Sequence, residues 1–97
     1  MKPLETSIMS PLKNKYLLAQ LLEGELPSTV LNFMLEADPE LDKYVLANIF
    51  LEEFDRLDSK ILPVIWKWKS AKSIRGISDQ QFDEAVLAQM RMAGYVV

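Results

Sequence analysis

Residues that start helices recur along this 97-residue chain, and each is followed by apolar residues at helical spacing. Ser10-Pro11 pairs a capping side chain with a proline, which the first turn of a helix tolerates because that N–H has no intrahelical partner. Ser28 and Asp38 precede similar apolar segments, and Ser78-Asp79-Gln80-Gln81 is a capping box. The pattern predicts an all-α or mostly α fold, a compact bundle of about four to five helices in a single domain over residues 1–97.

The expected helix boundaries follow from these caps and from the glycines. We expect helices from Ser10 to Gly24, from Ser28 to Ala37, from Asp38 to about Leu57 and from Ser78 to Gly94. The last of them carries one apolar stripe, formed by Phe82, Val86, Met90 and Ala93. The β-forming residues 95–97 that follow it predict a short terminal strand.

Residues 58–75 allow two interpretations. Asp58 or Ser59 caps a fourth helix, which is continuous or is broken near Pro63. Alternatively, Trp66-Lys67-Trp68-Lys69 alternates with a period of two, as a half-buried strand does. We favour the helix.

The third expected helix is apolar nearly all round. Leu41, Val45 and Ile49 fall on one side of it. The opposite side carries Leu46, Phe50, Phe54 and Leu57, and Tyr44 and Leu51 lie between the two sides. Such a helix is either central in its own core or covered by a partner or a second copy. Both interpretations stay open on the sequence alone.

Composition excludes several classes of chemistry. The chain has no cysteine and no histidine, which excludes disulfides, thiol nucleophiles, Ser-His catalysis and most zinc or haem sites. Its three glycines are scattered, so there is no glycine-rich phosphate loop. Glu52 and Asp55 are spaced to share a hard cation, although a solvated helix face explains them more simply. We predict no enzymatic activity, no metal and no small-molecule cofactor.

The sequence also carries signals of location. The first residues lack the apolar stretch of a secretory signal. The longest uncharged apolar run, residues 44–51, is far short of the roughly 20 residues that a helix needs to span a bilayer. We expect a cytoplasmic protein that does not associate with membranes.

Charge is distributed unevenly. Residues 1–59 carry five basic and eleven acidic side chains, whereas residues 60–97 carry six basic and three acidic ones. This split marks an interaction face, or two parts of one domain that attract each other. The tryptophans Trp66 and Trp68 interleave with basic residues, either as a stacking and phosphate-binding surface or as core residues covered by lysine stems. The basic residues are Lys67, Lys69, Lys72 and Arg75.

The C-terminal part of the chain resembles the second half of a winged helix-turn-helix domain. The residues that carry the resemblance lie between Gly76 and Val97, namely Ser78, Phe82, Val86, Met90, Gly94, Tyr95 and Val96. The resemblance implies a recognition helix that leads into a wing, in a fold used for DNA binding and for protein docking. The outward positions of this helix include Asp79, Asp83 and Glu84, which would repel phosphates.

Together these observations predict a small non-enzymatic protein that binds another macromolecule, most simply another protein or a second copy of itself. Adaptors, regulatory subunits and small inhibitors have this character. Aromatic side chains anchor such surfaces, so the candidate contact residues are Phe50, Phe54, Leu57, Trp66 and Trp68. The alternative is a nucleic-acid-binding domain that uses Lys67, Lys69, Lys72 and Arg75.

Overall fold

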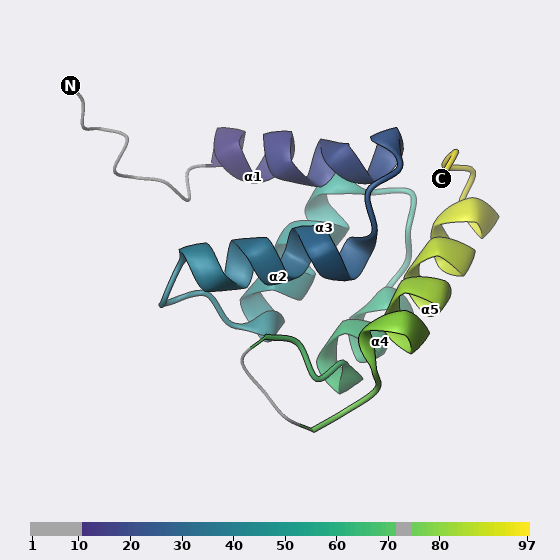
Figure 1. Ribbon diagram of the computed structural model, residues 1–97. Helices are drawn as coiled ribbons and strands as arrows, with labels where there is room; N and C mark the ends of the chain where they lie inside the picture. Colours follow the sequence, from purple (N-terminus) through teal and green to yellow (C-terminus); the bar gives the residue numbers. More distant parts are fainter. Residues whose placement is uncertain (1–10, 72–74) are drawn as a thin grey trace.

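The computed structural model describes residues 11–71 and 75–97, and these ranges form helices joined by short connections (Figure 1). The elements are α1 (Pro11–Leu18), the 3-10 helix η2 (Ala19–Glu23), α2 (Pro27–Ala37), α3 (Lys43–Glu53), α4 (Ile61–Lys67) and α5 (Asp79–Met92). The predicted all-α bundle is confirmed. Within the described ranges, β-type pairing is limited to one isolated parallel bridge between Trp68 and Ile77.

The helices enclose one hydrophobic core. α1 and α2 lie side by side, α3 packs against α4, and α5 contacts both α2 and α4 (Figure 1). Every described helix packs against at least two others, so each can bury an apolar side. The largest fully buried side chains are Trp68, Phe50, Phe82, Leu18, Leu21, Leu31, Met34, Leu35, Leu46, Ile61, Ile65 and Met90.

The first helical segment ends where predicted, and the last helix begins where predicted. Gly24 closes η2 with a left-handed backbone (φ +108°), and the predicted cap Ser10 lies outside the described residues. Ser78 caps α5, with its hydroxyl accepting from the N–H of Gln81 while the Gln81 side chain accepts from the N–H of Ser78. The predicted stripe of α5 faces the core: Phe82, Val86 and Met90 are buried and Ala93 is partly buried.

The second helix begins one residue earlier than predicted, and its cap comes from another helix. Leu26 is the N-cap residue of α2 and Pro27 follows it, so no local side chain accepts a hydrogen bond from the first turn. Ser28, the predicted cap, lies inside the helix, where its N–H and its hydroxyl donate to the two carboxylate oxygens of Asp83 at 2.6 and 2.8 Å. A buried carboxylate of α5 thus caps α2 at the positive end of its dipole. The outward position predicted for Asp83 is therefore wrong.

We expect Asp83→Ala to lower the free energy of unfolding by about 2–3 kcal/mol, because it leaves two buried donors of Ser28 without an acceptor. Urea unfolding followed by circular dichroism measures the change. Glu84→Ala is the matched control, since this neighbouring side chain is exposed and its loss should change stability by less than about 0.5 kcal/mol. Equal losses in the two variants would contradict the capping role.

The third helix is shorter than predicted at both ends. Asp38 does not start it: its N–H ends α2 on the carbonyl of Met34, and its carboxylate accepts from the N–H of Glu40 in a turn. Asp42 is the N-cap of α3, accepting from the N–H groups of residues 44 and 45. The helix ends at Glu53, and a turn that includes the bond from the N–H of Leu57 to the carbonyl of residue 54 follows.

The apolar surface of α3 is divided between core and solvent. Leu46, Ala47 and Phe50 are buried against the rest of the bundle. Tyr44 and Val45, in contrast, are 56% and 48% exposed. The helix is therefore central on one side only, and the all-round apolar pattern leaves two large side chains in water.

The ambiguous segment contains both predicted features. Residues 61–67 form α4, and Pro63 is tolerated because it stands in the first turn, where its missing N–H would have no intrahelical acceptor. Trp68 then takes extended backbone (φ −74°, ψ 138°) and pairs with Ile77. The alternation of this stretch is real over a few residues, since Trp68 is buried between the exposed Lys67 and Lys69.

The predicted terminal strand is wrong. Residues 95–97 form neither strand nor helix, because no extended neighbour offers them a ladder. They are held by side-chain contacts instead. Tyr95 packs edge-on against Phe54, with ring centroids 5.4 Å apart, and its hydroxyl accepts from the N–H of Arg56. The Arg91 guanidinium donates to the carbonyl of Val97 at 3.0 Å.

Candidate functional site

Four of the five predicted contact residues belong to the core. Phe50 and Trp68 are fully buried, and Phe54 and Leu57 are 2% and 7% exposed. No partner reaches these side chains while the domain is folded, so the structure does not place them on a contact surface. In a sequence, large apolar side chains have the same signature whether they anchor a partner or fill a core. Trp66 alone of the five is exposed, at 40%.

Trp68 has every feature of a structural tryptophan. Its ring stacks on Phe82 with centroids 4.1 Å apart and planes within 8° of parallel. Its indole N–H donates to the carboxylate of Asp79 at 2.8 Å, so the polar edge of the buried ring is satisfied. Its carbonyl accepts from the ammonium group of Lys43 at 2.6 Å. Each group of this residue is engaged within the domain.

Trp66 forms a surface with a residue that sequence reasoning did not select. Its ring lies against that of Tyr44, with centroids 5.9 Å apart and planes tilted by 40°. We call these two side chains the aromatic pair. It joins the N-terminal turn of α3 to the last turn of α4. The position of Tyr44 between the two apolar sides of its helix was the available signal.

The hydrogen-bonding groups at the tips of the aromatic pair have no partners among the described residues. Neither the Tyr44 hydroxyl nor the Trp66 indole N–H is bonded within the described parts of the chain. Buried phenol and indole groups are normally paired within the fold, whereas exposed ones are solvated and can donate to another molecule. The aromatic pair thus offers apolar rings and free donors together.

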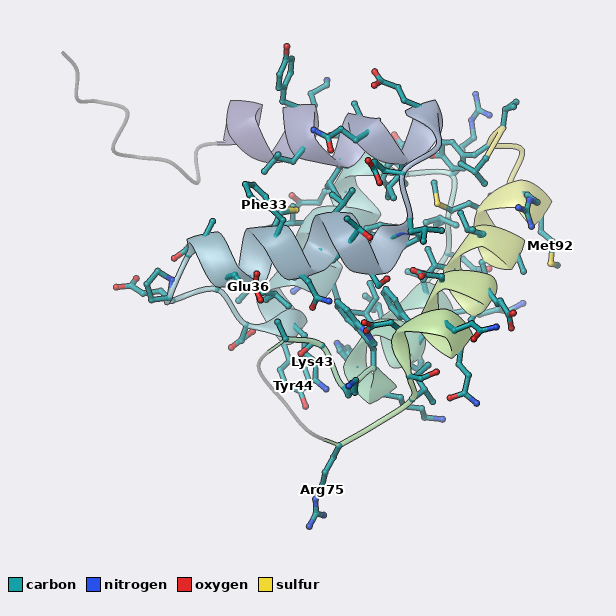
Figure 2. The ribbon with its side chains drawn as sticks, viewed as in Figure 1. Phe33, Glu36, Lys43, Tyr44, Arg75 and Met92 are labelled. Atoms are coloured by element: carbon teal, nitrogen blue, oxygen red, sulfur yellow. The ribbon has the colours of Figure 1, made fainter. Side chains whose placement is uncertain are left out.

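The predicted basic residues lie near this surface in the chain. Lys67 and Lys69 are exposed and flank the buried Trp68, and Arg75 is exposed in the connection to α5. Figure 2 shows Lys43, Tyr44 and Arg75 at the end of the molecule away from α1. The fourth predicted residue, Lys72, lies outside the described residues.

The carboxylates considered for a metal do not form a site in the described structure. Glu52 lies in the last turn of α3 and Asp55 in the turn after the helix has ended, so the helical spacing that would bring them together is absent. Across residues 11–71 and 75–97, no three carboxylates gather as metal ligands would.

Cavities elsewhere on the described part of the molecule include the following two. One, of about 330 Å³, is bordered by Arg56, Lys60 and Met92. Its cations already have partners: the Arg56 guanidinium donates to the carbonyl of Gly94 and lies over the ring of Tyr95, and Lys60 pairs with Asp58 at 4.0 Å. The other, of about 260 Å³ between α1 and α2, is lined by Leu17, Gln20, Glu25, Thr29, Val30 and Phe33.

None of the described helices has the length and apolar character to cross a membrane. Comparison of the chain with protein-family models, with curated proteins and with solved structures finds no match. The aromatic pair and its basic neighbours in the chain are therefore identified as the candidate functional site from the structure alone.

Proposed function

We propose that this chain is a non-enzymatic protein-binding module whose contact surface is centred on Tyr44 and Trp66. The observation that carries the proposal is the exposure of two large aromatic side chains that touch each other outside a core already filled by others. Tyrosine and tryptophan are the side chains most often found at the energetic centre of protein interfaces. An adaptor, a regulatory subunit or a small inhibitor would use such a surface.

The contact between the two exposed rings is what points to a partner. Apolar side chains that meet on the surface form a continuous patch, whereas scattered ones are ordinary. Val45, next to Tyr44 in the chain, is also half exposed and extends the apolar surface of α3. A partner that covers these side chains would remove apolar surface from water, which contributes about 25 cal/mol of binding free energy per Å² buried.

Nucleic-acid binding is the alternative, and it receives support from the exposure of Lys67 and Lys69. Two observations weigh against it. Trp68 is buried, so the two tryptophans do not form a pair of stacking surfaces for bases. The ring of Trp66 is already in contact with that of Tyr44. The net charge of −3 also disfavours attraction to a polyphosphate over long distances. The resemblance to winged helix-turn-helix domains remains a prediction, and it is compatible with protein docking.

We expect Tyr44→Ala and Trp66→Ala each to weaken partner binding by about tenfold or more while leaving the domain folded. The tagged full chain is used to capture partners from cell extract, and quantitative mass spectrometry compares wild type with the variants. Met92→Ala is the matched control, because this large apolar side chain is 87% exposed on α5, away from the pair. A partner set that is unchanged in both pair variants would refute the proposed surface.

A further inference from the structure

The segment between Ser59 and Ser78 has no carboxylate, and it contains the aromatic pair's tryptophan. Its basic side chains in the described ranges are Lys60, Lys67, Lys69 and Arg75. The acidic residues of the chain are concentrated before it. Lys67, Lys69 and Arg75 follow Trp66 in the chain, whereas Lys60 lies at the start of the segment and pairs with Asp58.

The backbone holds two of these lysines in place. The N–H of Lys69 donates to the carbonyl of Ile77 at 3.1 Å, and the carbonyl of Lys67 accepts from the N–H of Ile77 at 2.8 Å. Since Trp68 points into the core between them, both lysine side chains are directed to solvent immediately after Trp66. Their attachment points are ordered before any partner arrives, which lowers the entropic cost of binding.

Neither lysine is neutralised by the domain. Within the described residues, no carboxylate lies within ion-pairing distance of the Lys67 or Lys69 ammonium groups. Lys43 differs, since its ammonium group donates to the carbonyl of Trp68. Two exposed lysines that follow Trp66 in the chain therefore add positive charge, without an ion pair in the described residues, to the segment that carries the exposed ring.

Resting on the proposed function, we infer that the partner supplies an acidic segment with a large apolar anchor. The anchor side chain packs on Tyr44 and Trp66, and neighbouring Asp or Glu side chains pair with Lys67 and Lys69. Charge complementarity of this kind selects the partner and speeds association. A short acidic peptide fits better than a nucleic acid, because a polyphosphate that extends past these lysines meets a chain of net negative charge.

The test is a selection of random peptides displayed on phage against the full chain. We expect enriched peptides with a Trp, Phe or Leu flanked by Asp or Glu. The affinities of the best synthetic peptide, labelled with fluorescein, are then measured by anisotropy. We expect Lys67→Glu/Lys69→Glu to weaken the affinity of the protein for this peptide by about tenfold or more. A peptide with lysines in place of its acidic residues should bind this double variant again.

The matched control is Lys15→Glu/Lys60→Glu, which changes net charge by the same amount at two other exposed lysines. Its affinity for the peptide should remain within about threefold of wild type. If the enriched peptides need Trp66 but show no acidic preference, or the control weakens binding equally, the acidic partner is refuted and the proposed function stands. If they bind regardless of Tyr44→Ala and Trp66→Ala, the proposed surface fails as well. If no peptide is enriched and a labelled DNA strand or a second copy of the chain binds instead, both proposals are refuted.

Discussion

Trp68→Ala should lower the free energy of unfolding by about 4 kcal/mol, because it removes a fully buried indole and leaves a cavity that the neighbouring helices fill only in part. The substitution removes the stack on Phe82 and the hydrogen bond to Asp79 together. A domain of this size is stabilised by only about 5–15 kcal/mol, so the loss is a large share of the total. Urea unfolding monitored by circular dichroism measures it.

Trp66→Ala is the matched comparison, since it deletes the same side chain two residues earlier. With 40% of its surface already in water and no hydrogen bond to lose, this variant should lose no more than about 1 kcal/mol. Trp68→Phe keeps an aromatic ring on Phe82 and separates the stack from the bond to Asp79. Similar destabilisation by the two alanine variants would contradict the division into a core tryptophan and a surface tryptophan.

Gly76→Ala should also destabilise the domain strongly, by about 3 kcal/mol or more. Gly76 has φ +120°, which side-chain-bearing residues rarely adopt. A Cβ atom there would lie 2.2 Å from the carbonyl oxygen of Lys67 and 2.8 Å from the nitrogen of Lys69. These are the backbone groups that pair with Ile77, so relieving the clash breaks the bridge that holds both lysines.

Gly24→Ala separates the two causes. Gly24 has a similar φ of +108°, but a Cβ atom there meets nothing within 4 Å. This variant carries the conformational cost alone and should lose about 1 kcal/mol in the same urea experiment. A Gly76→Ala loss no larger than that of Gly24→Ala would show that the backbone near Lys67 yields without cost.

Helix starts were predictable where the capping group is local. The Ser78 box needs only residues within one turn of each other, and the structure contains it as predicted. Asp38 and Asp42 show the limit of this reasoning, because both can cap a helix and the proline after Asp38 favoured the wrong one. Asp38 is satisfied by a turn instead, and Leu41 enters the core before α3 begins.

The start of α2 shows a second limit. Ser28 has the composition of a cap, yet its hydrogen bonds run to Asp83 on α5. No local pattern pairs two residues so far apart in the chain. Asp83 was predicted to face outward because the pattern of its own helix contains no information about α2.

The sequence indicated the kinds of residue in the candidate site, but not which of the two tryptophans is exposed. A period of two places both tryptophans on the same face of a strand, so the alternation gave no reason to choose between Trp66 and Trp68. Phe82 and Asp79 made the choice, because they meet Trp68 with a matching ring and an acceptor. Tyr44 joined the site through contact with Trp66 from another helix.

The sequence by itself determined the helical class, the strongest caps and the absence of cysteine and histidine chemistry, because helix initiation depends on groups within a few residues of one another. The tertiary structure alone decided which aromatic residues are core and which are surface. Burial is a property of two or more segments packed together, so Phe50 and Trp68 became inaccessible only when α3, α4 and α5 met. Tyr44 and Trp66 stayed in water because the described part of the bundle has no further helix to cover them.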